Sequence, residues 1–244
     1  MKTKVAIIGY GTMGRAIARE LGKNDPSAEI FHADIGESKK PVCNSSYAIL
    51  AVKPQDAPAA IKEIKQGGLK KETVLISIMA GFPIKKIKSI SGHGKIVRVM
   101  PSLGLAAGEG IAGWISSGLS LSEKKGVKKF LDKITENFEV KKEDTLNKVT
   151  AVSGSGPAYF FLLAKLLEDS AKKLGFNKEE ARKLTDKTFQ ASAALSKNVD
   201  YAELMKKVAS KGGTTEAALK HLNFDKMMQK AVKAAYKRAK ELGK

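Results

Sequence analysis

The sequence contains very little cysteine and histidine. Cys43 is the only cysteine, and His32, His93 and His221 lie far apart, with no carboxylate or second histidine at the spacing of metal ligands. We therefore expect neither disulfide bonds nor a metal site. A single cysteine is typical of a reducing compartment, so we expect the protein to be cytoplasmic.

Long hydrophobic runs are also lacking. The longest nearly unbroken apolar stretch, residues 158–167, contains Lys165 and has about half the length of a membrane-spanning helix. Because the chain passes from Lys4 directly into a strand-like segment, we expect no signal peptide and no membrane association. With 244 residues, 43% of them hydrophobic, the sequence predicts a soluble globular protein of one large or two modest domains.

Acidic residues are outnumbered. The chain has 44 lysines and arginines against 25 aspartates and glutamates, for a formal net charge of +19. The lysines are spread along most of the predicted helices and are not gathered in one arm or one stripe with aromatic residues. This distribution indicates solvated helix faces and argues against a nucleic-acid partner, although the positive field would also attract an acidic substrate or a dinucleotide.

The hydrophobic pattern changes near residue 148. Before it, short apolar runs alternate with amphipathic segments, which predicts an α/β fold with a doubly wound parallel sheet over residues 1–148. After it, only helical patterns follow, so we expect an all-helical domain over residues 149–244. Its first helix is apolar almost all round, which predicts a subunit interface. The expected strands are 4–8, 29–33, 47–52, 73–77, 95–99 and 111–115, and the expected helices between them are 13–21, 56–64 and 122–134.

A glycine motif follows the first expected strand. Gly9, Gly11 and Gly14 form G-x-G-x-x-G between a strand and a helix. Such glycines permit a tight turn, close approach of the backbone to a pyrophosphate and close packing of helix on strand. The start of the helix would then hold the phosphates of a dinucleotide.

The end of the second expected strand bears on the choice of cofactor. Asp34 lies there, where an acid would accept the adenosine 2′-hydroxyl of NAD. Lys39 and Lys40 follow, and either could receive the 2′-phosphate of NADP. A turn aspartate without a ligand is an equal alternative for Asp34. The segment 35–46 is short and contains a proline, so we expect the usual crossover helix there to be missing or reduced.

Three small or polar turns follow the next strands: AVKPQD (51–56), SIMAG (77–81) and VMPS (99–102). Ligands of open parallel sheets bind at the carboxyl ends of the strands, so these turns outline a crevice. Two further segments, SGSG (153–156) and SKGGTT (210–215), bring small residues and hydroxyls to expected helix starts, where they would either bind an anion or merely cap the helix. No Ser-His-Asp order and no H-E-x-x-H motif is present, so hydrolysis has no visible machinery. Hydride transfer, in contrast, needs little from the protein beyond positioning.

Together, IGYGTMG, AVKP, Met100-Pro101, GEG at 108–110, SGSGPAY and GGTT resemble the pyrroline-5-carboxylate reductase family over essentially the full length. The resemblance implies an N-terminal Rossmann-type domain and a helical C-terminal domain for dimerisation and substrate binding. The homodimers of this family often assemble into larger rings. The implied reaction reduces 1-pyrroline-5-carboxylate to L-proline with NADPH, or possibly NADH.

The resemblance also implies site residues. Residues implied to bind the cofactor are Gly9, Gly11, Thr12, Met13, Gly14, Asp34, Val52, Lys53, Pro54, Ala80 and Gly81. Residues implied to bind the substrate are Ser210, Gly212, Gly213, Thr214 and Thr215. Within these sets, Ala80 and Gly81 lie near the nicotinamide, and Thr215 orients the imine as the catalytic residue.

The chain departs from the family pattern at several positions. Ser102-Leu103-Gly104 stands where the family commonly has Asn-Thr-Pro, Lys165 stands in place of a glutamate, and Lys211 in place of a proline. Two alternatives therefore stay open: a reductase for a related cyclic imine or hydroxy acid, and a non-catalytic dinucleotide-binding regulatory protein. Hydroxy-acid dehydrogenases usually place a lysine four residues past a glycine cluster, whereas Lys165 lies nine past Gly156, which argues against them.

Overall fold

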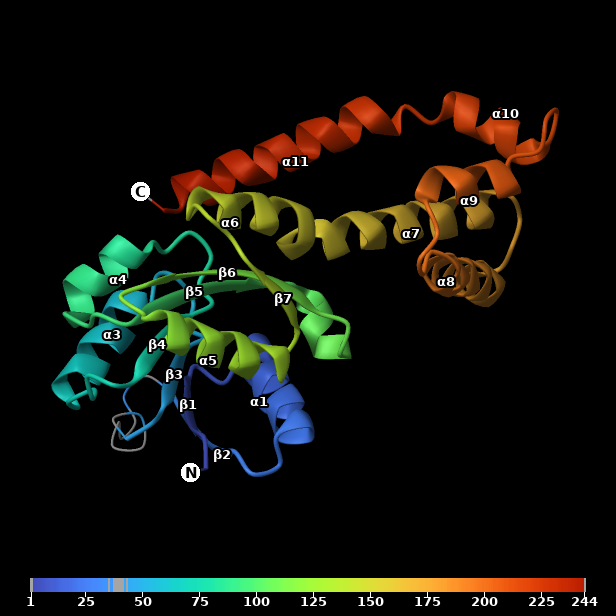
Figure 1. The fold of residues 1–244 in the computed structure, drawn as a ribbon. Helices are drawn as coiled ribbons and strands as arrows, with labels where there is room; N and C mark the ends of the chain where they lie inside the picture. Colours follow the sequence, from blue (N-terminus) through green and yellow to red (C-terminus); the bar gives the residue numbers. More distant parts are fainter. Residues whose placement is uncertain (1, 35, 37–41, 43, 244) are drawn as a thin grey trace. The chain divides into compact units, whose positions relative to one another are not determined.

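The computed structural model describes residues 2–34, 36, 42 and 44–243 (Figure 1). Up to residue 139 strands alternate with helices, and beyond it the described chain is helical, which confirms the predicted change of pattern. The first part contains β1 (Lys4–Ile8), α1 (Thr12–Asn24), β2 (Glu29–Ala33), β3 (Tyr47–Leu50), α3 (Ala57–Gln66), β4 (Val74–Ser77), α4 (Ile84–Ser91), β5 (Ile96–Pro101), the 3-10 helix η1 (Leu103–Ala107), β6 (Ile111–Ser117), α5 (Leu121–Asp132) and β7 (Glu136–Glu139). The second part contains α6 (Asp144–Val149), the π-helix η2 (Thr150–Gly154), α7 (Gly156–Lys173), α8 (Lys178–Leu195), α9 (Tyr201–Val208), α10 (Thr214–His221) and α11 (Phe224–Glu241).

The strands form one seven-stranded sheet in the order β2-β1-β3-β4-β5-β6-β7. All neighbouring strands in it are parallel except β5 and β6. The antiparallel pair follows from the connection: residues 102–110 contain only η1, and a parallel crossover needs a dozen residues or more. The order in which strands are added to the sheet reverses at β1, because β2 lies on one side of it and β3 on the other. The carboxyl ends of β1 and β3 therefore form a topological switch point.

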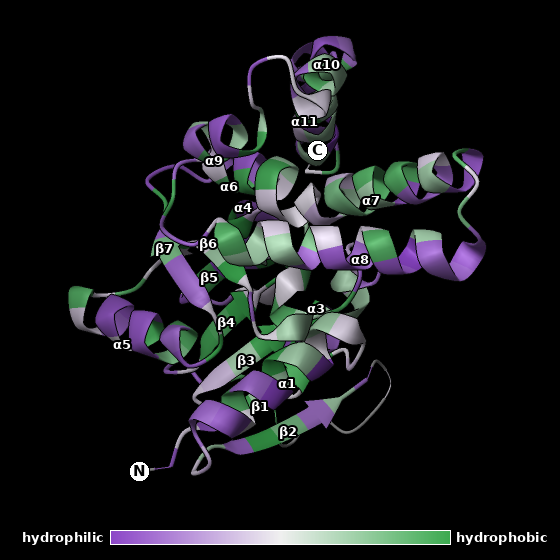
Figure 2. Cartoon of the chain, turned by 90° about the vertical axis from the view of Figure 1, so that its right-hand side faces the viewer, coloured by the Kyte–Doolittle hydropathy of each residue, from purple (hydrophilic) through white to green (hydrophobic). Residues whose placement is uncertain are grey.

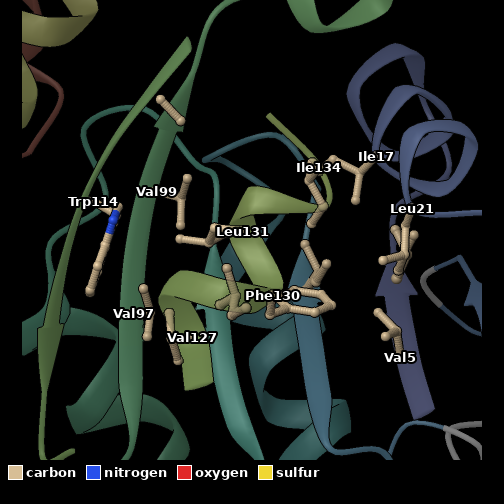
Figure 3. Packing of buried hydrophobic residues seen from close by; sticks show 14 of the residues in the cluster. Val5, Ile17, Leu21, Val97, Val99, Trp114, Val127, Phe130, Leu131 and Ile134 are labelled. Atoms are coloured by element: carbon tan, nitrogen blue, oxygen red, sulfur yellow. The ribbon is translucent and has the colours of Figure 1, made fainter. Parts of the chain in front are cut away.

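Successive residues of the strands point to opposite faces of the sheet, and helices cover both faces. On one face Val5 and Ile7 of β1 pack with α1 and α5; Figure 3 shows Phe130 and Leu131 of α5 among the strand side chains. On the other face Ala6 packs with its neighbours on α3 and α4. Two cores on one sheet are the expected result of continuously apolar strands, and the doubly wound α/β fold is confirmed.

The edge strand β7 and the helix α4 are among the elements that were not predicted from the sequence. The edge strand β7 is mostly exposed and carries Glu136, Asn137 and Glu139, so it lacks the apolar alternation by which strands are recognised. The helix α4 has only eight residues, of which only Ile87 is fully buried. The expected reduction of the crossover helix in residues 35–46 lies largely outside the described residues.

The chain divides into two compact units, one of residues 1–157 with 232–244 and the other of residues 158–231. The first unit therefore holds the sheet and also the end of α11. The predicted domain boundary after residue 148 stays a proposal about how binding and dimerisation are divided along the chain.

The second unit has almost no core of its own. Ala181 and Thr185 are its only buried residues. Of the 25 large apolar residues that are exposed in the described chain, 19 lie in this unit, and Phe160, Phe161 and Leu162 of α7 are more than half exposed. Figure 2 shows hydrophobic colouring along much of α7. A unit of this size is not stable with so few buried residues. Another protein surface must therefore cover these helices.

No helix in the described part of the chain has the length and the apolar character that a membrane span requires.

Candidate active site

The glycine-rich loop passes between the ends of the strands beside β1. Gly9 has φ 92° and donates its N–H to the Ala33 carbonyl at 2.9 Å, and a Cβ on Gly9 would lie 2.8 Å from the Ala51 oxygen. A Cβ on Gly14 would lie 2.3 Å from the Gly9 oxygen, whereas a Cβ on Gly11 would meet nothing within 4 Å. The first and third glycines thus permit close packing, and the middle one faces open space.

The start of α1 is free to receive an anion. Its N-cap residue is Gly11, which offers no side chain to the helix N–H groups, and no acidic residue lies in the first turn. Thr12 and Met13 are the first residues of the helix, so their N–H groups lie at the positive end of the helix dipole. Together with the open face of Gly11, this arrangement fits the pyrophosphate of a dinucleotide.

Asp34 lies directly beside this loop. Its Oδ1 accepts the backbone N–H of Tyr10 at 3.1 Å, and Arg15 Nη1 donates to the Tyr10 carbonyl at 2.8 Å. The Tyr10 ring stacks on His32 of β2, with ring centroids 4.2 Å apart. Tyr10 and Arg15 were not predicted from the sequence, and His32 was considered only as a metal ligand. The arginine directly after the third glycine was the available signal. Lys39 and Lys40 lie outside the described residues.

The turn after β3 packs on the same loop. A Cβ on Gly9 would lie 2.9 Å from Val52 Cγ1, and Lys53 beside it is exposed. The Lys53 carbonyl accepts the Asp56 N–H at 3.0 Å, so the turn leads directly into α3. The structure therefore brings the expected residues Val52, Lys53 and Pro54 to the switch point beside the glycine-rich loop.

The turn after β5 differs from the expected crevice lining. Ser102 is buried, its Oγ accepts the Ile111 N–H at 3.2 Å, and its own N–H donates to the Ile111 carbonyl at 3.0 Å. The hydroxyl thus holds β5 to β6. The following η1 is fixed on α1 by Arg19, whose Nη2 donates to the carbonyls of Leu105 and Ala106. The contacts of Ser102 and Arg19 therefore explain the conformation of this segment without a ligand.

In the second unit, SKGGTT forms a tight turn at the start of α10. The Ser210 carbonyl accepts the Gly213 N–H at 3.0 Å, and a Cβ on Gly213 would lie 2.5 Å from Ser210 Oγ. Gly213 is the N-cap residue, so no side chain caps the helix there. Thr214 and Thr215 open the helix, and Thr215 is half-buried. Ser210, Gly213, Thr214 and Thr215 are therefore neighbours at one helix start.

Glu216 is an unexpected charge at this helix start. Its Oε2 accepts the Gly212 N–H at 2.6 Å, and Lys220 pairs with its Oε1 at 3.2 Å. The Gly212 N–H, followed by Lys220, lowers the pKa of the Glu216 carboxyl, so it is ionised at neutral pH. Two donors of the turn are therefore already used by the chain, the Gly212 N–H by Glu216 and the Gly213 N–H by the Ser210 carbonyl. Lys211 beside it is exposed.

The predicted helix start at SGSG is confirmed, because α7 begins at Gly156, but no loop precedes it. α7 is reached from helical turns, because α6 runs into the π-helix η2 and only Ser155 separates η2 from α7. The Ser155 N–H donates to the Thr150 carbonyl, and the Ser153 hydroxyl donates to the Val149 carbonyl. Periodicity alone did not reveal this, because small residues break the apolar pattern without breaking the helical path. Such π-turns are frequent at functional sites.

Lys165 offers no sign of a catalytic lysine. It lies on α7 with an exposed side chain and forms an ion pair with Asp169. This is the i, i+4 pairing of a solvated helix face.

Proteins of known function resemble this chain over its full length. The sequence model of the family described as pyrroline-5-carboxylate reductase dimerisation matches residues 143–242. The pyrroline-5-carboxylate reductase of Pseudomonas aeruginosa is 33% identical over 264 aligned residues, which cover 98% of this chain and 96% of the relative. A solved pyrroline-5-carboxylate reductase from Coxiella burnetii has a TM-score of 0.86 at 30% identity and covers 100% of both chains. The Plasmodium falciparum pyrroline carboxylate reductase, solved with NADP bound, has a TM-score of 0.84 at 27% identity and covers 99% of this chain and 98% of its own.

Proposed function

The chain belongs to the pyrroline-5-carboxylate reductase family, and we propose that it reduces the C=N bond of 1-pyrroline-5-carboxylate to give L-proline, with NADPH or NADH as reductant. The observation that carries this proposal is the full-length likeness to reductases of this name, 33% identity over 98% of the chain. The open helix start at Gly11 supports it, because it is a site that fits a dinucleotide.

The cofactor contacts of the proposal are divided along the edge of the sheet. Gly9, Gly11, Thr12, Met13 and Gly14 form the loop and helix start at which the pyrophosphate binds, and the N–H groups at the start of α1 hold it. Asp34 lies at the adenosine ribose, Val52, Lys53 and Pro54 flank the adenosine half, and Ala80 and Gly81 lie at the nicotinamide. When bound, NADPH or NADH supplies the hydride, and the protein supplies binding and orientation.

The substrate contacts of the proposal lie at the start of α10. The N–H groups of Thr214 and Thr215 hold the substrate carboxylate at the positive end of the helix, in a turn shaped by Ser210, Gly212 and Gly213. The Thr215 hydroxyl bonds to the ring nitrogen and fixes the face of the imine. A threonine hydroxyl does not ionise near neutral pH, so the proton on nitrogen comes from solvent or is already present on an iminium.

The assembly is a homodimer in which the exposed helices of the second unit are covered by the partner. The dimerisation model of the family spans these helices, and their lack of a core gives the physical reason. Rings of dimers and a cytoplasmic location complete the proposal. The single cysteine of the chain supports that location.

Turnover by the purified protein tests the function. The absorbance of NADPH or NADH at the nicotinamide band should fall when pyrroline-5-carboxylate is added. A folded dimer that oxidises neither cofactor would refute the proposal. Binding of the cofactor without reduction of any cyclic imine would favour a regulatory protein. Turnover of a different cyclic imine or a hydroxy acid alone would favour the other alternative.

Thr215→Val tests the role of the hydroxyl. The substitution keeps the shape and the backbone N–H, so kcat should fall about 100-fold with a smaller change in the substrate KM. Thr215→Ser should restore most of the rate. Thr188→Val on the exposed face of α8 is the matched control. An unchanged kcat in Thr215→Val would remove Thr215 from the mechanism.

A further inference from the structure

The last turns of the chain pack against the unit that contains the sheet. Residues 232–244 belong to that unit although most of α11 precedes them. Ala239 is buried, and the Tyr236 hydroxyl donates to Asp144 Oδ2 of α6 at 2.6 Å. Figure 1 shows the end of α11 beside α6. These contacts fix where the chain goes after α11 ends at Glu241.

Immediately after α11, Leu242 lies against the turn that follows β4. A Cβ on Gly81 would lie 2.5 Å from Leu242 Cβ and 3.0 Å from its carbonyl carbon. The contact continues at Gly243, where a Cβ would lie 3.1 Å from the Gly81 oxygen. Gly81 has φ 68°, so its backbone conformation and its lack of a side chain both allow this approach. The C-terminal residues therefore cover the backbone of the turn directly.

The Gly81 turn follows β4, and the place of β4 in the sheet bears on which part of the cofactor this turn meets. β4 lies next to β3 on the side of β1 away from β2. If Asp34 at the end of β2 marks the adenosine end and the loop after β1 holds the pyrophosphate, the nicotinamide half extends toward the ends of β3 and β4. The Gly81 turn is then the part of the sheet edge that the reacting ring meets.

We propose that Leu242 is a positioning residue for the nicotinamide half of the cofactor, acting through Gly81. The Cβ and backbone of Leu242 lie against Gly81 and hold the Ala80-Gly81 turn in place, whereas the residue as a whole is 44% exposed. This inference rests on the proposed function only in placing the nicotinamide at that turn. It assigns no contact between Leu242 and the cofactor.

Leu242→Gly in the full-length chain tests the proposal, because it removes the Cβ that lies against Gly81. The Kd for NADPH, titrated by fluorescence, should stay within about twofold, because the pyrophosphate and adenosine contacts are untouched. The nicotinamide emission of the bound cofactor should fall about twofold as the ring environment loosens. With pyrroline-5-carboxylate, kcat should fall about tenfold, since small misplacement of a reacting group has large effects on rate. The kinetic isotope effect from cofactor deuterated at the transferred position should rise.

Two variants separate positioning from stability. Leu242→Ala keeps the Cβ that lies against Gly81 and should retain emission and kcat. Leu121→Ala removes an exposed leucine at the start of α5 in the same unit and should change neither.

The outcomes are distinguishable. Unchanged emission, kcat and isotope effect in Leu242→Gly would overturn the proposal, as would an equal fall in Leu121→Ala. If wild-type protein binds NADPH without reducing pyrroline-5-carboxylate, the proposed reaction fails, while the emission of Leu242→Gly still decides on the positioning role.

Discussion

We propose that the Asp34 carboxylate disfavours the 2′-phosphate of NADPH, and Asp34→Asn tests this directly. The carboxylate is held at the end of β2 by the Tyr10 N–H at 3.1 Å. Asparagine keeps an oxygen that accepts this hydrogen bond and removes only the negative charge. The fold of the loop should therefore be preserved, and any change in cofactor preference should come from electrostatics.

The size of the effect follows from Coulomb's law. A 2′-phosphate carries a charge of about −2, and at ~6 Å from a carboxylate in a water-like dielectric the repulsion is ~1.4 kcal/mol. Such a difference is about tenfold in a binding constant. We therefore expect Asp34→Asn to raise kcat/KM for NADPH about tenfold relative to that for NADH.

Steady-state kinetics with both cofactors at saturating pyrroline-5-carboxylate measure this ratio. Asp34→Ser serves as the second variant, because its shorter side chain removes the charge and also weakens the bond to Tyr10. It should shift the preference in the same direction and also lower the affinity for both cofactors. If the ratio stays unchanged in both variants, or moves toward NADH, Asp34 does not discriminate the 2′ position.

Removing the carboxylate in Glu143→Ala leaves the buried Arg98 guanidinium without its partner at 2.6 Å, so the free energy of unfolding should fall by about 3–5 kcal/mol. Urea unfolding measures this, and a loss below ~1 kcal/mol would contradict it. The hydrogen bond from Lys95, followed by the capping bonds of the helix start, lowers the pKa of Glu123 from 4.5 to about 2. The ionised Glu123 side chain therefore stabilises the fold fully above pH 4.5, and this stabilisation is lost as the pH falls toward 2. Glu123→Gln should lose this acid dependence, and an unchanged slope of melting temperature between pH 4.5 and 2.5 would show that the ion pair does not stabilise the fold. Gly14→Ala places a Cβ 2.3 Å from a backbone oxygen of the glycine-rich loop and should raise the Kd for NADPH at least about tenfold. Wild-type affinity by calorimetric titration would mean that the loop tolerates the shift.

The strands of the sheet were predictable because their side chains are buried on both faces. Continuous apolar runs at β1 and β4 follow directly from that environment. The edge strand β7 was not predictable in the same way, because an exposed strand is stabilised by backbone pairing to β6, which leaves no trace in the side-chain pattern. The antiparallel direction of β6 was likewise decided by the length of its connection, not by its composition.

The candidate site was also predictable only in part. The spacing of Gly9, Gly11 and Gly14 predicted a tight loop, because Gly9 and Gly14 meet local steric requirements of strand, turn and helix. The helix start at SGSG was predicted, but the π-helix before it was not, since it depends on how the neighbouring helix continues. The ionised Glu216 at the start of α10 has its effect through its contact with Gly212, which composition does not reveal.

By itself, the sequence determined the α/β class, the position of the helical region and the glycine-rich loop, because these depend on periodicity and on local backbone sterics. Tertiary structure alone decided which distant residues meet. Asp34 contacts Tyr10, Arg98 pairs with Glu143, and Leu242 packs on Gly81. Each of these contacts joins residues separated by 24 or more positions, and such pairs are set by the order of strands and the course of the connections between them.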